Sequence, residues 1–184
     1  MIAHPPTLTT ARLMLRELVP GDAAAVAAGA GDPSVAQYLL QVPSPYPVSL
    51  ARNWVLHRIE WWQLARGVTY AIAPVASPSQ LLGTVSLRRY LRDRRAELGY
   101  WLAAGAWGQG YATEAAGAAI DFGFRQLGVA RIYAQVIAGN RGSLRVLDKL
   151  GMIREGVQRG HVFKARRLHD IVLYGLLRDE WDAR

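Results

Sequence analysis

Residues 97–115 read ELGYWLAAGAWGQGYATEA and contain the pattern on which the fold depends. An alternating apolar run at 96–102 predicts a strand, and the glycine-containing segment after it leads into a helix predicted at 112–127. Gly128 ends that helix, and a β run follows at 132–137. A strand, a helix and a second strand in this order form a crossover. We therefore expect the two strands to be parallel and their connection to be right-handed.

The segment before this helix suits an oxygen-rich ligand. Gly108 and Gly110 carry no side chain, and the helix start offers unpaired N–H groups and the positive end of the helix dipole. Three or four charge-assisted hydrogen bonds, each worth roughly 1.5–3 kcal/mol, would hold a pyrophosphate without a lysine. The segment has neither a Walker ending nor the G-x-G-x-x-G spacing. On their own, two glycines before a helix are commonly only a turn.

The other patterns predict a single domain over residues 1–184, of the α+β class. Seven strands are expected, at 13–18, 68–75, 81–90, 96–102, 132–137, 154–163 and 167–177. Four helices are expected, at 23–30, 50–65, 112–127 and 143–150. This order predicts a mixed sheet with helices on both faces.

Composition narrows the classes of function. The 184 residues include no cysteine, which excludes disulfides, a thiol nucleophile and thiolate metal sites, and we expect no metal. The sequence shows no apolar run of membrane-spanning length and no leader pattern. We therefore expect a cytoplasmic protein that has no membrane partner. The net charge of +8 attracts anions such as nucleic acid, a ribosome surface or a polyphosphate cofactor. The basic residues are 20 Arg and 2 Lys, a bias that codon usage alone can produce.

Five motifs, in order along the chain, carry a resemblance to a known family. They are TARLMLR at 10–16, Pro45-Tyr46-Pro47, the 97–115 stretch, Asn140-Arg141-Gly142-Ser143 with Leu150-Gly151-Met152, and the segment 170–181. Together they resemble the GNAT superfamily of acetyl-CoA-dependent N-acetyltransferases, and within it the branch of ribosomal-protein N-terminal acetyltransferases. The resemblance implies a mostly antiparallel seven-stranded sheet whose fourth and fifth strands are parallel and splayed apart.

The resemblance also implies an acetyl-CoA site. The pyrophosphate would lie on the backbone of five consecutive residues, Gln109, Gly110, Tyr111, Ala112 and Thr113. The pantetheine arm would enter between the splayed strands and pair with the main chain of Tyr100, Trp101 and Leu102. Asn140 would bind the arm near the thioester. Trp107 stands where the superfamily often has Gln or Arg, and a tryptophan is usual for this branch.

Acetyl transfer to an amine requires a base for the ammonium proton and an acid for the departing thiolate. Glu97 is the candidate base, because it is the only carboxylate on the strand that leads into the loop. The alternative is that Glu97 only pairs with Arg88, Arg94 or Arg95. His161 is a second candidate base, with a solvated surface position as its alternative.

The acid is less clearly marked. The superfamily's usual tyrosine is replaced by Leu147, and Ser143 matches the serine that this branch has near the sulfur. For Ser143 the alternative is capping of a helix. By analogy with the family, Tyr46 and Trp62 border the acceptor pocket, and core packing is the alternative for both. His161 is also expected beside the acceptor.

The leading hypothesis is thus an N-acetyltransferase that acts on a protein N-terminus, such as that of a ribosomal protein, or on a small amine. One alternative is a protein that binds acyl-CoA without turnover, which the leucine at position 147 favours. Another is a basic nucleic-acid-binding module, with arginines at positions 88, 89, 92, 94 and 95. No nucleic-acid-binding motif accompanies them, so nucleic acid is expected only through a ribosome. The oligomeric state stays open, a homodimer included.

Overall fold

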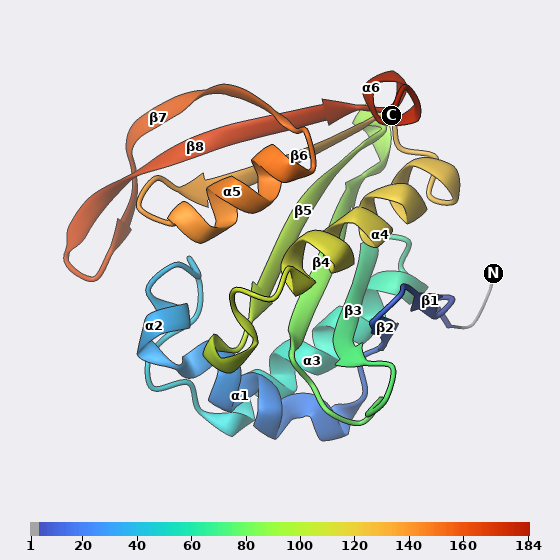
Figure 1. The fold of residues 1–184 in the computed structure, drawn as a ribbon. Helices are drawn as coiled ribbons and strands as arrows, with labels where there is room; N and C mark the ends of the chain where they lie inside the picture. Colours follow the sequence, from blue (N-terminus) through green and yellow to red (C-terminus); the bar gives the residue numbers. More distant parts are fainter. Residues whose placement is uncertain (1–3) are drawn as a thin grey trace.

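The computed structural model describes residues 4–184, and its centre is an eight-stranded sheet (Figure 1). The strands lie across the sheet in the order β1-β2-β3-β4-β5-β6-β8-β7. Their bounds are β1 Leu8–Thr9, β2 Leu13–Glu17, β3 Gly67–Pro74, β4 Gly83–Tyr90, β5 Arg95–Leu102, β6 Arg131–Ile137, β7 Ile153–Lys164 and β8 Arg167–Leu177. Among the described residues, β5 and β6 are the one parallel pair, and the other neighbours are antiparallel.

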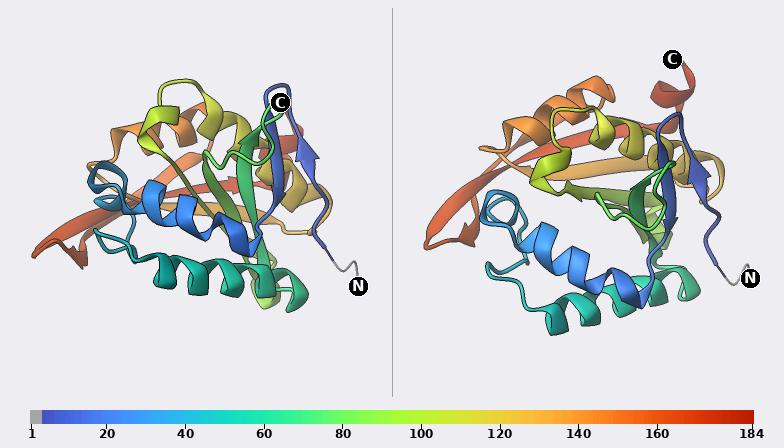
Figure 2. Two further views of the ribbon diagram at one scale, coloured as in Figure 1. Left: turned by 90° about the horizontal axis from the view of Figure 1, so that it is seen from below. Right: turned by 60° about the horizontal axis from the view of Figure 1, so that its bottom comes forward.

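Helices cover both faces of the sheet (Figure 2). On one face α3 packs against β3 and against α1, and on the other α4 packs against β4 and β5. The α-helices are α1 Ala23–Gly31, α2 Pro33–Ala36, α3 Val48–Gln63, α4 Tyr111–Arg125, α5 Arg141–Lys149 and α6 Arg178–Asp182. Short 3-10 turns occur at Pro20–Asp22, Leu91–Asp93 and Ala104–Ala106. No helix within residues 4–184 has the length and apolar character needed to cross a membrane.

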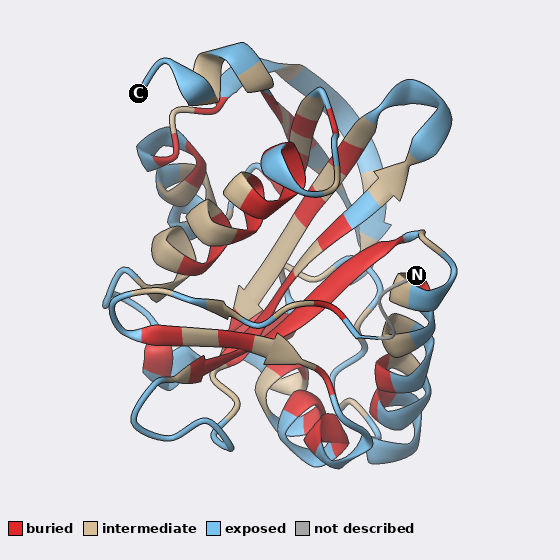
Figure 3. Ribbon diagram, turned by 90° about the vertical axis from the view of Figure 1, so that its right-hand side faces the viewer, coloured by how far each residue is buried: buried red, intermediate tan, exposed pale blue. Residues whose placement is uncertain are grey.

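Side chains alternate between the two faces along β5, as its sequence predicts. Leu98 and Leu102 join the large core that includes Ile120 of α4. Trp101 points the other way and packs against the smaller cluster that includes Val55 of α3. Strand β3, which lies between β2 and β4, is buried from its first residue to its seventh, as the burial colours show (Figure 3).

The α+β class and the mixed, mostly antiparallel sheet are confirmed, but the count of seven strands is wrong. The eighth strand is β1, whose two residues pair with Met14 and Leu15 of β2. Two residues are too few for an alternating pattern to reveal. The expected four helices are present, and the short helices α2 and α6 are additional. Four or five residues show no helical periodicity, so their sequences carry no signal of this kind.

The parallel strands β5 and β6 separate soon after they begin. Their pairing joins Arg95 with Arg131, Ala96 with Ile132 and Glu97 with Tyr133, and within the described residues it extends no further. β5 continues to Leu102 on its β4 partner, and β6 continues on β8. A wedge therefore opens beyond Glu97, which confirms the splayed strands (Figure 1).

Candidate active site

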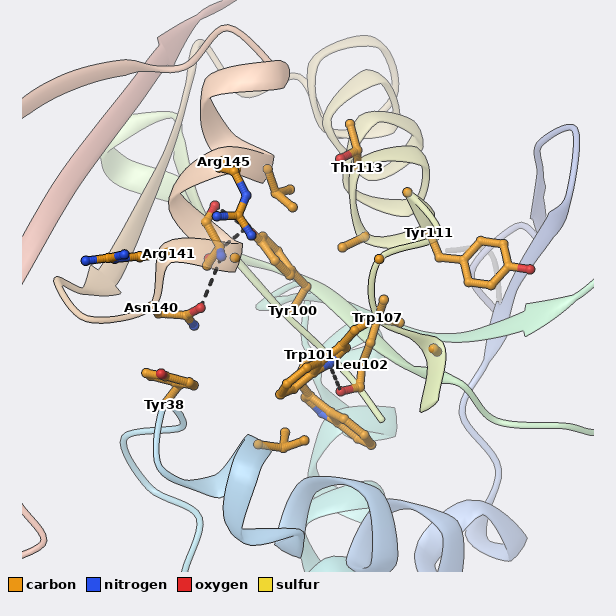
Figure 4. A pocket seen from close by; sticks show the side chains of 18 of the residues that line it. Tyr38, Tyr100, Trp101, Leu102, Trp107, Tyr111, Thr113, Asn140, Arg141 and Arg145 are labelled. Atoms are coloured by element: carbon orange, nitrogen blue, oxygen red, sulfur yellow. Dashed lines mark hydrogen bonds between the residues drawn. The ribbon is translucent and has the colours of Figure 1, made fainter. Parts of the chain in front are cut away.

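A cavity of about 640 Å³ lies beside the diverging ends of β5 and β6 (Figure 4). Its walls come from α2, the end of β5, the loop and first turn of α4, and one side of α5 along its whole length. Nine of the residues predicted to bind cofactor line it: Tyr100, Trp101, Leu102, Gly110, Tyr111, Ala112, Thr113, Asn140 and Ser143. The tenth, Gln109, lies in the same loop, and its side-chain amide donates to the carbonyl of Gly105 at 3.3 Å.

The loop before α4 presents its backbone donors to the cavity. Gly110 is the residue that precedes the helix and has φ +81°, and Gly108 has φ +76°. Such positive angles favour glycine over residues with a Cβ atom. None of the six amides from Gly108 to Thr113 donates a hydrogen bond within residues 4–184. The helix start thus offers a run of unpaired donors at the positive end of the α4 dipole.

A contact far apart in sequence holds this loop in place. Glu114, in the first turn of α4, accepts from the Thr10 hydroxyl at 2.6 Å and from the backbone and guanidinium of Arg12 at 3.0 and 2.8 Å. Arg12 also donates to the carbonyl of Gln109 at 2.9 Å and lies over the Tyr111 ring. These residues, which the sequence did not single out for this role, tie β2 to the cavity loop.

This tie predicts a dependence of stability on pH. Burial opposes ionisation of Glu114, but the hydrogen bonds from Thr10 and Arg12 outweigh it and hold the pKa of Glu114 below its ordinary value. A lowered carboxyl pKa stabilises the fold above the unfolded value of about 4.3, and that contribution is lost as the pH falls through the folded pKa. We expect Glu114→Gln to unfold more easily than wild type at pH 7. The difference in free energy of unfolding between wild type and Glu114→Gln should shrink as the pH falls below about 4.3. Urea titrations at several pH values would measure it. A difference that is the same at every pH would contradict this role of the carboxylate.

Tyr100, Ser143 and Asn140 form a connected group across the wedge. Figure 4 shows Tyr100 and Asn140 on the two sides of this group. The Tyr100 hydroxyl lies 2.8 Å from the Ser143 Oγ and 3.2 Å from the Ser143 carbonyl. Burial raises the pKa of Tyr100, so it keeps its proton at neutral pH. The Asn140 Oδ1 accepts from the Ser143 amide at 3.1 Å and is the cap of α5. Capping therefore falls to Asn140, and the Ser143 hydroxyl instead contacts Tyr100.

The basic side of α5 completes the cavity wall, and Leu147 of the same helix does not line it. Leu147 is fully buried in the main core, so no proton donor stands where the superfamily has its tyrosine. Arg141, Arg145 and Lys149 line the cavity at intervals of one helical turn. These three cations were not among the predicted site residues, although their i, i+4, i+8 spacing is visible in the sequence. They make this wall attractive to phosphate groups.

Glu97 lies at the base of the wedge on the face of the sheet that α3 covers. It is half-buried, and its Oε2 accepts from the hydroxyls of Tyr90 at 3.3 Å and Tyr133 at 3.4 Å. No arginine nitrogen of the described chain comes within 4.0 Å of this carboxylate. The alternative in which Glu97 merely pairs with Arg88, Arg94 or Arg95 is thus not what the structure contains.

The three predicted acceptor residues lie outside the cavity wall. Tyr46 is half-buried and packs against the cluster between α1 and α3. Trp62 lies against Phe122 of α4, with ring centroids 6.3 Å apart, and contributes to the main core. His161 is exposed on β7, where the pairing with β8 is irregular. The β7–β8 hairpin approaches the segment between α2 and α3, because Lys164 Nζ donates to the Val42 carbonyl at 3.1 Å.

Comparisons with known proteins agree with this geometry. The model of the acetyltransferase (GNAT) domain matches residues 12–153. An uncharacterized N-acetyltransferase, p20 of Bacillus licheniformis, is 32% identical over 176 residues, which are 95% of this chain and 98% of that protein.

Solved structures share the fold. The ribosomal-protein-S5-alanine acetyltransferase of Vibrio fischeri is 20% identical with a TM-score of 0.84, over 96% of this chain and 99% of that one. Mycobacterium smegmatis RimJ in complex with CoA-disulfide is 21% identical and also has a TM-score of 0.84. The match covers 97% of this chain and 90% of that one. With the family model and p20 spanning most of the sequence, the chain belongs to the GNAT family of N-acetyltransferases.

Proposed function

We propose that this chain transfers the acetyl group of acetyl-CoA to a primary amine by direct attack, with Glu97 as general base. The observation that carries the proposal is the run of unpaired backbone donors from Gly108 to Thr113 at the edge of the cavity. Such donors suit a diphosphate, and the basic residues of α5 face the same space. GNAT enzymes use acetyl-CoA, and CoA is present in the RimJ complex named above.

The residues present fit this cosubstrate. The diphosphate would be held by the amides of Gln109, Gly110, Tyr111, Ala112 and Thr113, with Arg141 and Arg145 supplying positive charge. The unpaired edge of β5 beyond Glu97 is suited to pair with the amide groups of the pantetheine arm. Asn140 uses Oδ1 to cap α5, which leaves its Nδ2 to donate to the arm.

Bound acetyl-CoA would supply a thioester carbonyl, to which the amine nitrogen adds and from which the thiolate leaves as the C–S bond breaks. Glu97, directly or through water, takes the proton that the ammonium must lose before its nitrogen can attack. The Ser143 hydroxyl, hydrogen-bonded to Tyr100, is positioned to give a proton to the thiolate. Because the Tyr100 pKa is raised, the pair holds its protons at neutral pH. His161 is the second candidate base.

The acceptor is an amine on a protein N-terminus or on a small molecule. Among the fold relatives, the Vibrio fischeri protein is described as acting on ribosomal protein S5. A basic chain with net charge +8 is compatible with docking on a ribosome, so a ribosomal-protein N-terminus belongs in the acceptor panel.

The proposal is tested by thiol release from acetyl-CoA over a panel of amines and N-terminal peptides, together with calorimetry of acetyl-CoA binding. We expect saturable binding and acceptor-dependent release of free CoA. Absence of acetyl-CoA binding would overturn the proposal. Binding without release over a broad panel would instead favour a protein that binds acyl-CoA without turnover.

A further inference from the structure

A second group of charged and aromatic side chains lies on the face of the sheet opposite α4. Arg58 of α3 lies over the ring of Trp61, with its guanidinium carbon 3.6 Å from the centroid of that ring. The same carbon lies 5.2 Å from the ring centroid of Trp54. Arg88 of β4 approaches the same Trp61 ring at 5.9 Å. Two arginines thus share one aromatic platform, an arrangement that holds guanidinium groups in fixed orientations.

Arg58 has hydrogen-bond donors that nothing in the described chain satisfies. Its Nε and Nη1 atoms are buried and without a hydrogen-bond partner. No carboxylate of residues 4–184 forms an ion pair with it. Burial and the nearby charge of Arg88 lower the pKa of Arg58 to about 10, so the group is still a cation at neutral pH. A buried, charged donor without an acceptor lowers the stability of the fold, and native proteins contain few such groups. Those that they keep call for an explanation, such as a role in function.

The surroundings of Arg58 connect it to the proposed chemistry. Arg58 interacts electrostatically with Glu97 and with Tyr46, the proposed base and a proposed acceptor-pocket residue. Glu97 is held by the hydroxyls of Tyr90 and Tyr133 and does not neutralise Arg58 by direct contact. One face of the sheet therefore presents a carboxylate suited to an ammonium group and, beside it, a guanidinium suited to an anion.

We propose that Arg58, assisted by Arg88, binds a carboxylate of the acceptor, so that the acceptor class is an amine bearing a nearby carboxylate. This inference rests on the proposed acetyl transfer and specifies its substrate. A guanidinium presents parallel N–H groups that match a carboxylate in two hydrogen bonds. Its two edges pair Nη2 with Nε or Nη2 with Nη1, so a carboxylate at either edge would meet one of the two unsatisfied nitrogens of Arg58. The complementary pair, Glu97 for the amine and Arg58 for the carboxylate, fits a zwitterionic acceptor. Two sources share this chemistry: small amino acids, and protein N-termini with an acidic residue.

The experiment compares acceptors that differ only in a carboxylate or its amide. The peptide arm of the experiment compares Ala-Asp-Ala amide with Ala-Asn-Ala amide. The small-molecule arm of the experiment compares glycylglycine with glycylglycinamide. In wild type we expect the carboxylate member of at least one arm to have a kcat/KM about tenfold higher or more, from charge-assisted hydrogen bonds. The arm that shows the preference identifies the source.

Variants then assign the preference to this site. Arg58→Met should abolish the carboxylate preference, measured as the ratio of kcat/KM for the carboxylate member to kcat/KM for the amide member, and the loss should appear in KM. Arg88→Met, at an exposed position of the same cluster, should reduce the preference and covers the case in which Arg58→Met does not fold. Arg52→Met is the matched control, because Arg52 is exposed on the same helix and should leave both kcat/KM values as in wild type. If the wild-type kcat/KM is the same for the carboxylate and the amide member in both arms of the experiment, the inference is overturned. A carboxylate preference that survives in both Arg58→Met and Arg88→Met would also overturn it.

A binding measurement separates this inference from the proposed function. Calorimetry with CoA in place of acetyl-CoA allows no turnover, and each carboxylate ligand is titrated into wild type, Arg58→Met and Arg52→Met. Carboxylate binding that needs Arg58, without acetyl transfer to any acceptor, would overturn the proposed reaction and support the site. Acetyl transfer without any carboxylate preference would support the reaction and overturn the site.

Discussion

Replacing Glu97 by glutamine is expected to lower kcat/KM for acetyl transfer by about 10²–10⁴-fold, the range of a lost general base. Glutamine keeps the size of the side chain and can still accept from Tyr90 and Tyr133, but it cannot take a proton from the acceptor ammonium. The measurement is steady-state thiol release with the best acceptor of the panel. Acetyl-CoA affinity by calorimetry should stay within about twofold of wild type, because the predicted diphosphate contacts lie at the start of α4.

The control is Glu60→Gln, which removes an exposed carboxylate from α3 and should leave the rate unchanged. His161→Ala tests the second candidate base in the same assay. If the kcat/KM of Glu97→Gln lies within about threefold of wild type while that of His161→Ala falls strongly, the general base is His161 and not Glu97. Loss in neither variant would mean that water alone accepts the proton.

The sequence predicted most of the architecture because long elements carry a strong periodic signal. The 112–127 pattern became α4, and the strands beside it became β5 and β6 with the expected parallel pairing. The elements it missed are short: β1 has two residues and α2 has four. β1 depends on its tertiary pairing with β2, which local pattern does not report. α2 has a local start signal in Asp32 and Pro33, but its four residues are too few to show helical periodicity.

The candidate site was predictable where function depends on the backbone. The loop from Gly108 to Thr113 was singled out by its resemblance to the family's pyrophosphate loop, since two glycines before a helix are, on their own, equally typical of a simple turn. Contacts such as Glu114 with Thr10, separated by 104 positions, leave no such trace. The unsatisfied donors of Arg58 are also invisible in sequence, since they depend on burial between Trp54 and Trp61. The alternative in which Ser143 caps α5 is wrong, because the cap is Asn140, three residues earlier.

Replacing Gly110 by valine is expected to weaken CoA binding by about 100-fold or more. Gly110 has φ +81°, where a β-branched residue is strongly disfavoured, so the loop must change its backbone path. That change would turn several amides away from the diphosphate. Losing two charge-assisted hydrogen bonds of roughly 1.5 kcal/mol each corresponds to about two orders of magnitude in affinity. Calorimetry with CoA gives the affinity, and circular dichroism verifies that the variant is folded.

The matched control for this loop is Gly105→Val. Gly105 lies five residues earlier, in the 3-10 turn Ala104–Ala106, and does not have a positive φ. A Cβ atom built at Gly105 meets no other atom within 4 Å, so the substitution adds bulk near the cavity without forcing the backbone to change. CoA affinity close to wild type in Gly105→Val, with the loss confined to Gly110→Val, would tie binding to the backbone geometry at the start of α4. Undiminished affinity in a folded Gly110→Val protein would mean that the diphosphate is held elsewhere, with the cationic wall of Arg141, Arg145 and Lys149 as the next surface to test.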